Sequence, residues 1–391
     1  MSEPEPGPRG ATTCTAPRSA GGYTCTLYES IGELDQAQWL AACDLAANPT
    51  LDPRFLKAVE LSLAGYARFW YAIMHDASGT PAACACYCRY TVDGALFAPP
   101  RVQAWVRSIR KLIPSFFMLP ILLCGVPIST GQKQGQIAIA PTADLEQLVP
   151  LLDDIARKLA KSTRCPLIAF KEFDAETAAA LAGLTRRGYR RADSVVSYTL
   201  KADFASFDDF YEQRSKRTRA NMRKVFSKFS EAGLTSRTLK GGEGVAELFT
   251  DEVHQLYQAV FDRAQVKFEW VPAAFFRELA RQLPEESRFT FIERGSQVVG
   301  FCCALNSTVY HNMLYCGVDY DLNAEGDVYF NVIYRGVEHG LNQHPQYVKI
   351  GASADEFKQR MGCDSLQLYY YVRPLGLVTT LIFKAIARYL F

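Results

Sequence analysis

Residues 288–318 read RFTFIERGSQVVGFCCALNSTVYHNMLYCGV. Two apolar runs, Arg288–Glu293 and Gln297–Leu305, flank an Arg-Gly-Ser turn, and this pattern is typical of a β-hairpin. The run Val309–Val318 follows a second short polar break and is predicted as a third strand. The next long apolar segment, Val328–Leu341, is predicted as a helix. The stretch therefore predicts neighbouring strands with a helix packed against them.

The segments on either side extend this unit to a whole subdomain. Helical spacing of apolar residues precedes the hairpin, and a strand, a short helix and a last strand follow it. These flanking elements are the helices Val245–Phe261 and Ala273–Leu283, the strand Gln346–Gly351, the helix Asp355–Met361 and the strand Gln367–Val372.

The first half of the chain repeats the same order of elements. Its predicted elements are the helix Leu51–Gly65, a hairpin of Phe69–Met74 and Ala82–Tyr90, the helix Ala143–Lys161, the strand Pro166–Phe170, the helix Ala175–Arg187 and the strand Ser194–Leu200. The last helix of each half ends alike, at Arg186-Arg-Gly188-Tyr and at Arg360-Met-Gly362-Cys. An internal duplication is the simplest explanation.

Composition indicates an ordinary globular protein. Of 391 residues, 49% are hydrophobic and 21% charged, and the net charge of +2 does not by itself indicate a nucleic-acid partner. The twelve cysteines form no C-x-x-C pair, so neither a disulfide framework nor a metal site is predicted. Cys84, Cys86 and Cys88 should share one face of a strand, whereas the adjacent Cys302 and Cys303 should point to opposite faces. Reduced, buried thiols in a cytoplasmic protein are expected.

The chain divides into four predicted segments. Residues 1–22 are predicted to be a disordered tail, because they lack an apolar run. Residues 23–205 and 206–374 form the two subdomains, and 375–391 form an amphipathic C-terminal helix. Leu112–Ile128 is also strongly apolar, but three prolines and a glycine interrupt it.

Several short motifs in this order resemble a known family. They are Ser215-Lys-Arg-Thr-Arg-Ala-Asn-Met-Arg-Lys224, Gly317-Val-Asp319, Glu338-His-Gly340, Lys349-Ile-Gly351 with Phe357-Lys-Gln-Arg-Met-Gly362, and Gly125-Val-Pro-Ile-Ser129. Over residues 23–374 the chain resembles the tandem GNAT-fold acyltransferases, which include the Fem-like peptidyltransferases and bacterial ceramide synthases. The resemblance implies an α/β fold of two GNAT-like subdomains, each a mixed sheet flanked by helices. The phosphate loop of simple GNAT enzymes, Arg/Gln-x-x-Gly-x-Gly/Ala, is absent from this sequence.

The resemblance implies an N-acyltransferase that moves an acyl group from acyl-CoA, a co-substrate and not a bound cofactor, onto an amine. The second subdomain, 206–374, is then the catalytic one. A lipid-like acceptor such as a sphingoid base is expected, because apolar segments lie beside basic ones, and Leu112–Ile128 is expected to dock on a bilayer or to line an acyl tunnel. Two alternatives stay open. One is a Fem-like peptidyltransferase that uses aminoacyl-tRNA, the only case that requires nucleic acid. The other is a non-catalytic protein that binds lipid or peptidoglycan.

Three residues near the strand Val309–Val318 are candidates for the chemistry, and two of them, His311 and Asp319, are expected to face one pocket. His311 could act as a general base near neutral pH, or it could be a structural histidine. Asp319 could be a carboxylate tuned into a base, or part of the turn that ends the strand. Tyr315 could donate to an oxyanion or protonate the leaving group, or it could be a structural tyrosine.

Four more residues are candidates for binding the donor. Gly326 and Asp327 precede the helix Val328–Leu341, whose free N–H groups could hold a pyrophosphate, although Asp327 could instead be a simple helix cap. Lys358 matches a recurrent lysine of the family and, with Arg360, could contact a phosphate or carboxylate. A solvent-exposed helix lysine is the alternative.

Arg214–Lys228 contains seven basic residues and no acidic one, and its apolar residues have helical spacing. This basic helix could bind coenzyme A, tRNA phosphates or anionic lipid headgroups, or it could be a solvated face. We therefore expect a cytoplasmic protein with peripheral contact to an anionic surface at the inner face of the membrane. This contact is expected through Leu375–Phe391, lying flat on the bilayer; the alternative is that this helix packs on the protein's own core.

Overall fold

The computed structural model describes residues 12–14, 22–97, 100–128, 131–264, 270–352, 355–376 and 379–380. Among them are fourteen strands that belong to one sheet. The strands are β1 (Thr12–Cys14), β2 (Thr24–Tyr28), β3 (Ala67–His75), β4 (Pro81–Asp93), β5 (Met118–Cys124), β6 (Ile137–Ile139), β7 (Leu167–Phe173), β8 (Arg190–Lys201), β9 (Leu234–Lys240), β10 (Ser287–Arg294), β11 (Gln297–Asn306), β12 (Tyr310–Val318), β13 (Tyr347–Gly351) and β14 (Asp364–Pro374).

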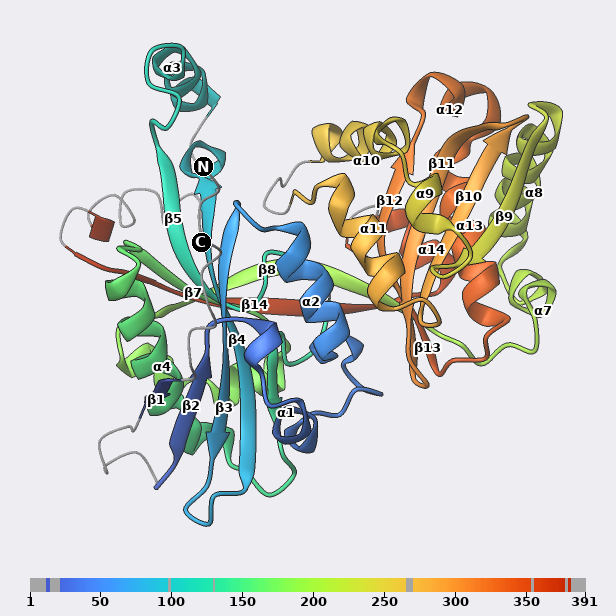
Figure 1. Cartoon of the computed structure of the whole chain (residues 1–391). Helices are drawn as coiled ribbons and strands as arrows, with labels where there is room; N and C mark the ends of the chain where they lie inside the picture. Colours follow the sequence, from blue (N-terminus) through green and yellow to red (C-terminus); the bar gives the residue numbers. More distant parts are fainter. Residues whose placement is uncertain are drawn as a thin grey trace, which may run out of the picture.

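Helices lie on both faces of this sheet (Figure 1). The α-helices are α1 (Gln36–Ala42), α2 (Pro53–Ser62), α3 (Pro100–Arg110), α4 (Leu145–Ser162), α5 (Ala175–Ala180), α6 (Gly183–Arg186), α7 (Phe207–Glu212), α8 (Lys216–Glu231), α9 (Val245–Leu248), α10 (Asp251–Arg263), α11 (Ala273–Gln282), α12 (Tyr320–Gly326), α13 (Val328–Leu341) and α14 (Asp355–Met361). Short 3₁₀ helices occur at Ile31–Glu33, Pro49–Leu51 and Gly94–Phe97. Within the described residues, no helix is both long and apolar enough to span a bilayer.

The strand order is nearly the same from both ends of the sheet. It runs β1-β2-β3-β4-β5-β7-β14-β8-β13-β12-β11-β10-β9, with β6 beside β4. Each half contains one parallel pair, β5 with β7 and β12 with β13, in an otherwise antiparallel sheet. The predicted fold class, two tandem GNAT-like subdomains with mixed sheets and flanking helices, is confirmed.

The last strand of each half lies against the other half. β14 lies between β7 and β8, and β8 pairs in turn with β13. These are the two strands that follow the matching Gly188 and Gly362 turns. The exchange makes the sheet continuous across the molecule. The subdomain limits 23–205 and 206–374 stay predictions, although β14 pairs outside the half to which the sequence assigned it.

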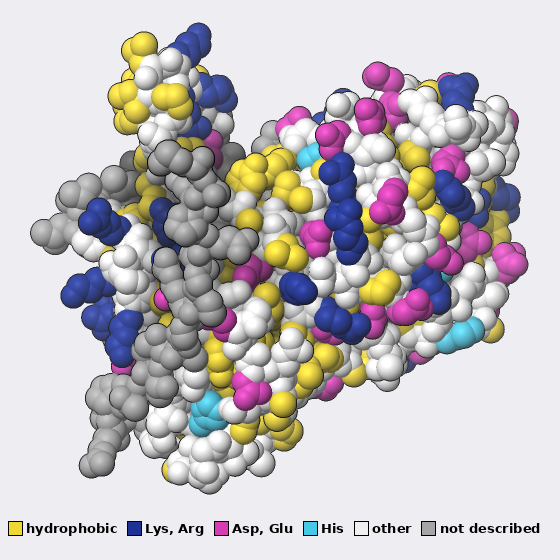
Figure 2. Space-filling view, viewed as in Figure 1, with side chains coloured by type: hydrophobic (Ala, Val, Ile, Leu, Met, Phe, Trp, Pro, Cys, Tyr) yellow, Lys and Arg dark blue, Asp and Glu magenta, His cyan; other side chains and the backbone are white. Residues whose placement is uncertain are grey.

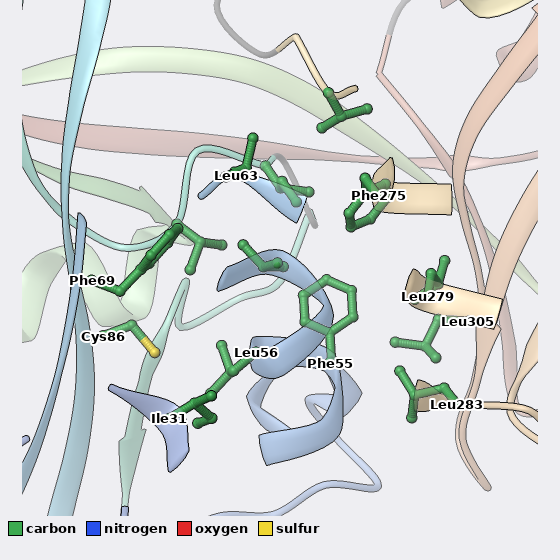
Figure 3. Close-up of a cluster of buried hydrophobic side chains, with 14 of the residues drawn as sticks. Ile31, Phe55, Leu56, Leu63, Phe69, Cys86, Phe275, Leu279, Leu283 and Leu305 are labelled. Atoms are coloured by element: carbon green, nitrogen blue, oxygen red, sulfur yellow. The ribbon is translucent and has the colours of Figure 1, made fainter. Parts of the chain in front are cut away.

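Three apolar cores hold the layers together. One lies behind the N-terminal half around α4, another lies behind the C-terminal half around α13 and α8, and the third is shared by both halves. In the shared core Phe55 of α2 meets Phe275 of α11, with ring centroids 6.4 Å apart (Figure 3). Because burial of apolar area is the main stabilising term in folding, this core fixes the two halves relative to each other.

The cysteine pattern is confirmed. Cys84, Cys86 and Cys88 all lie in the shared core. Cys302 and Cys303 point to opposite faces of β11, into the C-terminal core and the shared core respectively. Burial raises the pKa of each of these thiols, so they are poor nucleophiles.

Several local predictions are corrected. Part of the apolar segment Leu112–Ile128 is β5, a central strand of the sheet, whose residues from Ile121 to Cys124 are buried, so these residues cannot dock on a bilayer. The helix predicted over Val245–Phe261 is divided into α9 and α10, because the Thr250 side chain caps α10. Thr12–Cys14, within the predicted tail, pairs with β2. The predicted C-terminal helix, 375–391, lies almost entirely outside the described residues.

Candidate functional site

A wedge opens between the parallel strands β12 and β13 of the C-terminal half. The two strands pair only at Tyr310–Tyr347, His311–Val348 and Asn312–Lys349. Beyond Asn312, β12 continues to Val318 beside β11, and no described strand lies on its other side. Backbone N–H and C=O groups on that side lack a strand partner, so they can interact with a substrate.

A β-bulge lies at the mouth of this wedge. Cys303 is opposite Tyr315 and Ala304 is opposite Met313, so Leu314 is an extra residue in β12. A bulge bends the strand and redirects its backbone groups, and bulges are common beside active sites. Here it falls two residues after the last β12–β13 pair. This position suits an oxyanion hole made of peptide N–H groups.

The corresponding wedge of the N-terminal half is filled by the chain itself. β5 and β7 separate after the Cys124–Phe170 pair. The chain then returns, so that Gln134 bridges to Phe173 of β7 and β6 pairs with β4. Lys171 Nζ donates to the Ile128 carbonyl over 2.9 Å and holds the returning loop. The C-terminal wedge is therefore the better candidate for an active site.

Lys358 of α14 closes one end of the C-terminal wedge. Its side chain is buried, and Nζ donates to the carbonyls of Gly351 (3.1 Å) and Ala352 (2.7 Å) at the end of β13. The alternative of a solvent-exposed helix lysine is therefore wrong. Burial raises the pKa of the Cys316 thiol to about 11, an effect that the Lys358 ammonium opposes, so the two side chains are neighbours.

A second buried lysine, which the sequence did not single out as a site residue, lies beside the wedge on β13. Lys349 Nζ donates to Gln132 Oε1 (2.7 Å) and to the Gly131 carbonyl (3.1 Å), and it lies 4.2 Å from the centre of the Tyr310 ring. Burial, with a contribution from Lys133, lowers the pKa of Lys349 to about 7. The only signal in the sequence is its place in Lys349-Ile-Gly351, within an apolar strand.

His311 lies beneath α13, away from solvent. It is 1% exposed, its Nδ1 is 2.7 Å from Asn306 Oδ1, and its ring centroid is 5.9 Å from that of His339. Burial, and after it the charges of His339 and Arg288, lower the pKa of His311 to about 3. The helix above it needs glycine at position 340, where a Cβ would lie 2.6 Å from His311 Cδ2. This environment is that of a structural histidine.

Asp319 lies at the other end of β12. Its Oδ1 accepts from the N–H groups of Asp321 (2.9 Å) and Leu322 (3.3 Å), which makes it the N-cap of α12. It borders an open pocket formed with α10 and the β10–β11 turn. Eight residues of a strand span roughly 26 Å. The expectation that His311 and Asp319 face one pocket is therefore wrong.

Tyr315 points to the other face of β12, into an aromatic cluster of the shared core. Its ring centroid lies 5.5 Å from that of Tyr257, 5.8 Å from Phe275 and 5.9 Å from Phe276. The catalytic roles of His311, Asp319 and Tyr315 stay predictions, and the structure does not bring these three side chains together.

The start of α13 is occupied by the protein. Lys228 of α8 lies 3.3 Å from Asp327 Oδ1 and 3.3 Å from the Ala324 carbonyl. Asp327 makes no cap hydrogen bond and has a left-handed backbone (φ 45°), so it is not the simple N-cap considered above. A Cβ at Gly326 would lie close to Leu234. A pyrophosphate at this helix start would have to displace the Lys228–Asp327 ion pair. Arg360 is half-exposed, and its nearest carboxylate is Glu356 at 4.0 Å.

The predicted basic helix is confirmed as α8. Met222 and Phe229 are buried against the C-terminal core, and the Ser215 side chain caps the first turn. Some of its basic residues are used internally: Arg219 donates to the Glu212 carbonyl over 2.6 Å, and Arg223 donates to Tyr211 over 3.0 Å. Lys216, Arg217 and Lys224 are exposed and form no ion pair with any described residue.

A two-part GNAT-type sheet defines the class of the protein: β12 and β13 separate after Asn312 and Lys349 in the C-terminal half, and the wedge of the N-terminal half is filled. A family model matches residues 30–374, so the chain belongs to the FemAB-like family, described as peptidoglycan biosynthesis/recognition. No curated protein matches the sequence significantly.

Solved structures with very different sequences share this fold. One is FemX (10% identity, TM-score 0.54, 92% of this chain and 98% of that one). Another is a tandem GNAT protein from the clavulanic acid biosynthesis pathway (11% identity, TM-score 0.52, 90% and 99%). A third is the C-terminal domain of a putative lysylphosphatidylglycerol synthetase from Agrobacterium fabrum (10% identity, TM-score 0.52, 87% and 92%). At these identities, the likeness establishes the fold alone.

Proposed function

We propose that this chain transfers an acyl group from an activated donor to an amine, and that the reaction takes place in the C-terminal wedge. The observation that supports this most is the Leu314 bulge, which falls where β12 leaves β13. It redirects the peptide N–H of Leu314 at the point where β12 separates from β13. The filled N-terminal wedge acts as a structural counterpart.

In this reaction the amine nitrogen attacks the acyl carbonyl carbon, and the new C–N bond forms. The carbonyl oxygen becomes an oxyanion, which the peptide N–H of Leu314 stabilises. The C–S or C–O bond to the leaving group then breaks, and the amine proton passes through water to the leaving thiolate or alkoxide. Lys358 acts as a positioning residue, because its Nζ holds the end of β13 in place.

An acyl thioester is the first candidate for the donor. Its pyrophosphate would need a site other than the start of α13, where Lys228 and Asp327 pair. Aminoacyl-tRNA is the second candidate, favoured by membership in the FemAB-like family and by the exposed bases Lys216, Arg217 and Lys224 on α8. A lipid-like amine, such as a sphingoid base, remains the proposed acceptor for the thioester.

The test is a matched pair of single-turnover assays on the full chain. One contains radiolabelled long-chain acyl-CoA with a sphingoid base, and the other contains radiolabelled aminoacyl-tRNA with a peptidoglycan precursor. Amide product in either assay supports acyl transfer and identifies the donor. Absence of product in both, together with no coenzyme A, acyl chain or tRNA in native mass spectra of the purified protein, contradicts the proposal.

A further inference from the structure

A helical tip projects from the N-terminal half. It consists of α3, the turn that follows and the first residue of β5, residues 100–118, and is called the α3 tip here. Figure 1 shows it standing beyond the end of the sheet, clear of the helices that cover the sheet. Nothing in the proposed chemistry uses it, so its surface needs another explanation.

The α3 tip concentrates the exposed apolar residues of the molecule. Among the described residues eight large apolar side chains are exposed, and five of them lie here. They are Leu112 (87% exposed), Trp105 (59%), Ile113 (53%), Val102 (39%) and Met118 (37%). Apolar surface gathered in this way marks an interaction site, whereas single exposed apolar residues do not.

The charge of the same segment has one sign. No aspartate or glutamate occurs from residue 94 to residue 143. Arg101, Arg107 and Lys111 are exposed and form no ion pair with any residue that the structure describes. Figure 2 shows apolar and basic side chains side by side on this tip.

The tip is held in shape from below. Arg110 forms two 2.6 Å hydrogen bonds to the carboxylate of Asp93, at the end of β4, and its Nε donates to the Phe116 carbonyl over 2.8 Å. The Trp105 and Phe116 rings meet edge to face, with centroids 5.6 Å apart. These contacts hold the tip in one conformation. The exposed apolar side chains therefore stay on its surface.

We propose that the α3 tip binds the surface of an anionic lipid bilayer. Trp105, Leu112 and Ile113 would enter the interfacial region, while the exposed bases contact lipid phosphates. Tryptophan favours this interface, because its ring has both an apolar body and a polar N–H. A protein partner would need an apolar groove with acidic side chains placed around it. An anionic bilayer has an apolar interior beside negatively charged headgroups over its whole surface. This inference does not depend on the proposed chemistry.

Vesicle flotation with the full chain tests the proposal. Vesicles of phosphatidylcholine alone are compared with vesicles containing about one third phosphatidylglycerol. A variant with Trp105→Ala, Leu112→Ala and Ile113→Ala should bind the anionic vesicles roughly tenfold more weakly or worse. Its control is Leu40→Ala with Leu61→Ala, two exposed apolar residues elsewhere, which should bind like the unmodified protein.

The basic residues are tested separately. Replacing Arg101, Arg107 and Lys111 by Gln should weaken binding about fivefold per residue, and added salt should remove the difference. The matched control removes the same charge from α8 by Lys216→Gln, Arg217→Gln and Lys224→Gln, and it should retain binding. The proposal fails if the full chain floats with neither vesicle, or if the α3-tip variants bind normally. It also fails if deleting residues 376–391 or the α8 changes alone abolish binding.

Discussion

Lys349 Nζ lies 2.7 Å from Gln132 Oε1, so a strand of the C-terminal half is bonded to the loop that fills the N-terminal wedge. The two residues are 217 positions apart in sequence. The contact joins β13, beside the C-terminal wedge, to the loop that fills the N-terminal wedge. It buries the Lys349 side chain between the two halves of the molecule. Burial of a lysine disfavours its ammonium form, which is the physical origin of the lowered pKa.

Stability should therefore depend on pH through Lys349. Its pKa is about 7 in the folded protein and 10.5 in the ordinary state, so between these values the unfolded chain binds a proton that the folded chain does not. The free energy of unfolding should rise as pH rises from 7 toward 10.5. Below pH 7 the folded protein binds the proton too, so the destabilisation by buried Lys349 should reach its full size there and stay constant. Lys349→Met should flatten this slope in urea unfolding from pH 6 to 9, whereas Lys224→Met on the surface should leave it unchanged.

His311 should make the free energy of unfolding depend on pH in the acid range. Its pKa is lowered from 6.5 to about 3, so the unfolded chain takes up a proton first as pH falls. Stability should drop from pH 6.5 toward pH 3, and His311→Gln should reduce the drop. The half-buried His75→Gln is the control. Turnover of His311→Gln at pH 8 should remain within a few-fold of the unmodified enzyme; a loss of several hundredfold with intact folding would restore the general-base hypothesis.

Lys358 should matter for activity more than its exposed neighbour does. Lys358→Met leaves the Gly351 and Ala352 carbonyls without their donor, at a cost of about 1–3 kcal/mol, and loosens the end of β13. We expect kcat of Lys358→Met to fall at least tenfold with little change in KM. Lys358→Arg should not restore kcat, because the larger guanidinium group does not fit at this buried position. Gln359→Ala, at an exposed position on the same helix, should be neutral. Equal activity of Lys358→Met and Gln359→Ala would argue against the positioning role.

Close packing behind the wedge predicts sensitivity at Gly317. A Cβ there would clash with the Phe301 ring and would lie 2.7 Å from the Tyr257 backbone nitrogen. Gly317→Ala should lower the free energy of unfolding by roughly 1–3 kcal/mol, because β12 or α10 must shift. At Gly32 the nearest atom to an added Cβ is 3.7 Å away, so Gly32→Ala should change stability little. Thermal unfolding of both variants measures the difference.

The sequence predicted most of the sheet but not how its halves join. Hairpins such as β10–β11 have strong local signals, alternation and a glycine turn, and were found within a residue or two. β5 was missed because its continuous apolar run resembles a membrane segment and Pro120 interrupts the strand pattern, and only its neighbours β4 and β7 explain the burial. The exchange of β8 and β14 depends on pairing between distant segments, which no local pattern encodes.

The candidate site was harder to predict for the same reason. Lys358 was found through a family motif, whereas its hydrogen bonds to the end of β13 required the fold. Asp319 and His311 lie on or after one strand, and sequence proximity suggested one pocket. The strand's length and its two faces separate them. The Leu314 bulge has no residue signature at all, since it is defined by the register of β11 against β12.

Deletion of Leu314 tests the central claim most directly. Removing this one residue leaves Met313 and Tyr315 adjacent, opposite Ala304 and Cys303 respectively, so the sheet register is retained and only the bulge is lost. Leu314→Ala keeps the bulge and controls for the lost side chain. With whichever donor and acceptor give product in the single-turnover assays, the deletion should lower kcat by roughly 10²–10³-fold, the cost of losing one oxyanion donor, while Leu314→Ala stays within a few-fold of the unmodified enzyme. A folded deletion variant with unchanged kcat would contradict the assignment of the C-terminal wedge as the active site.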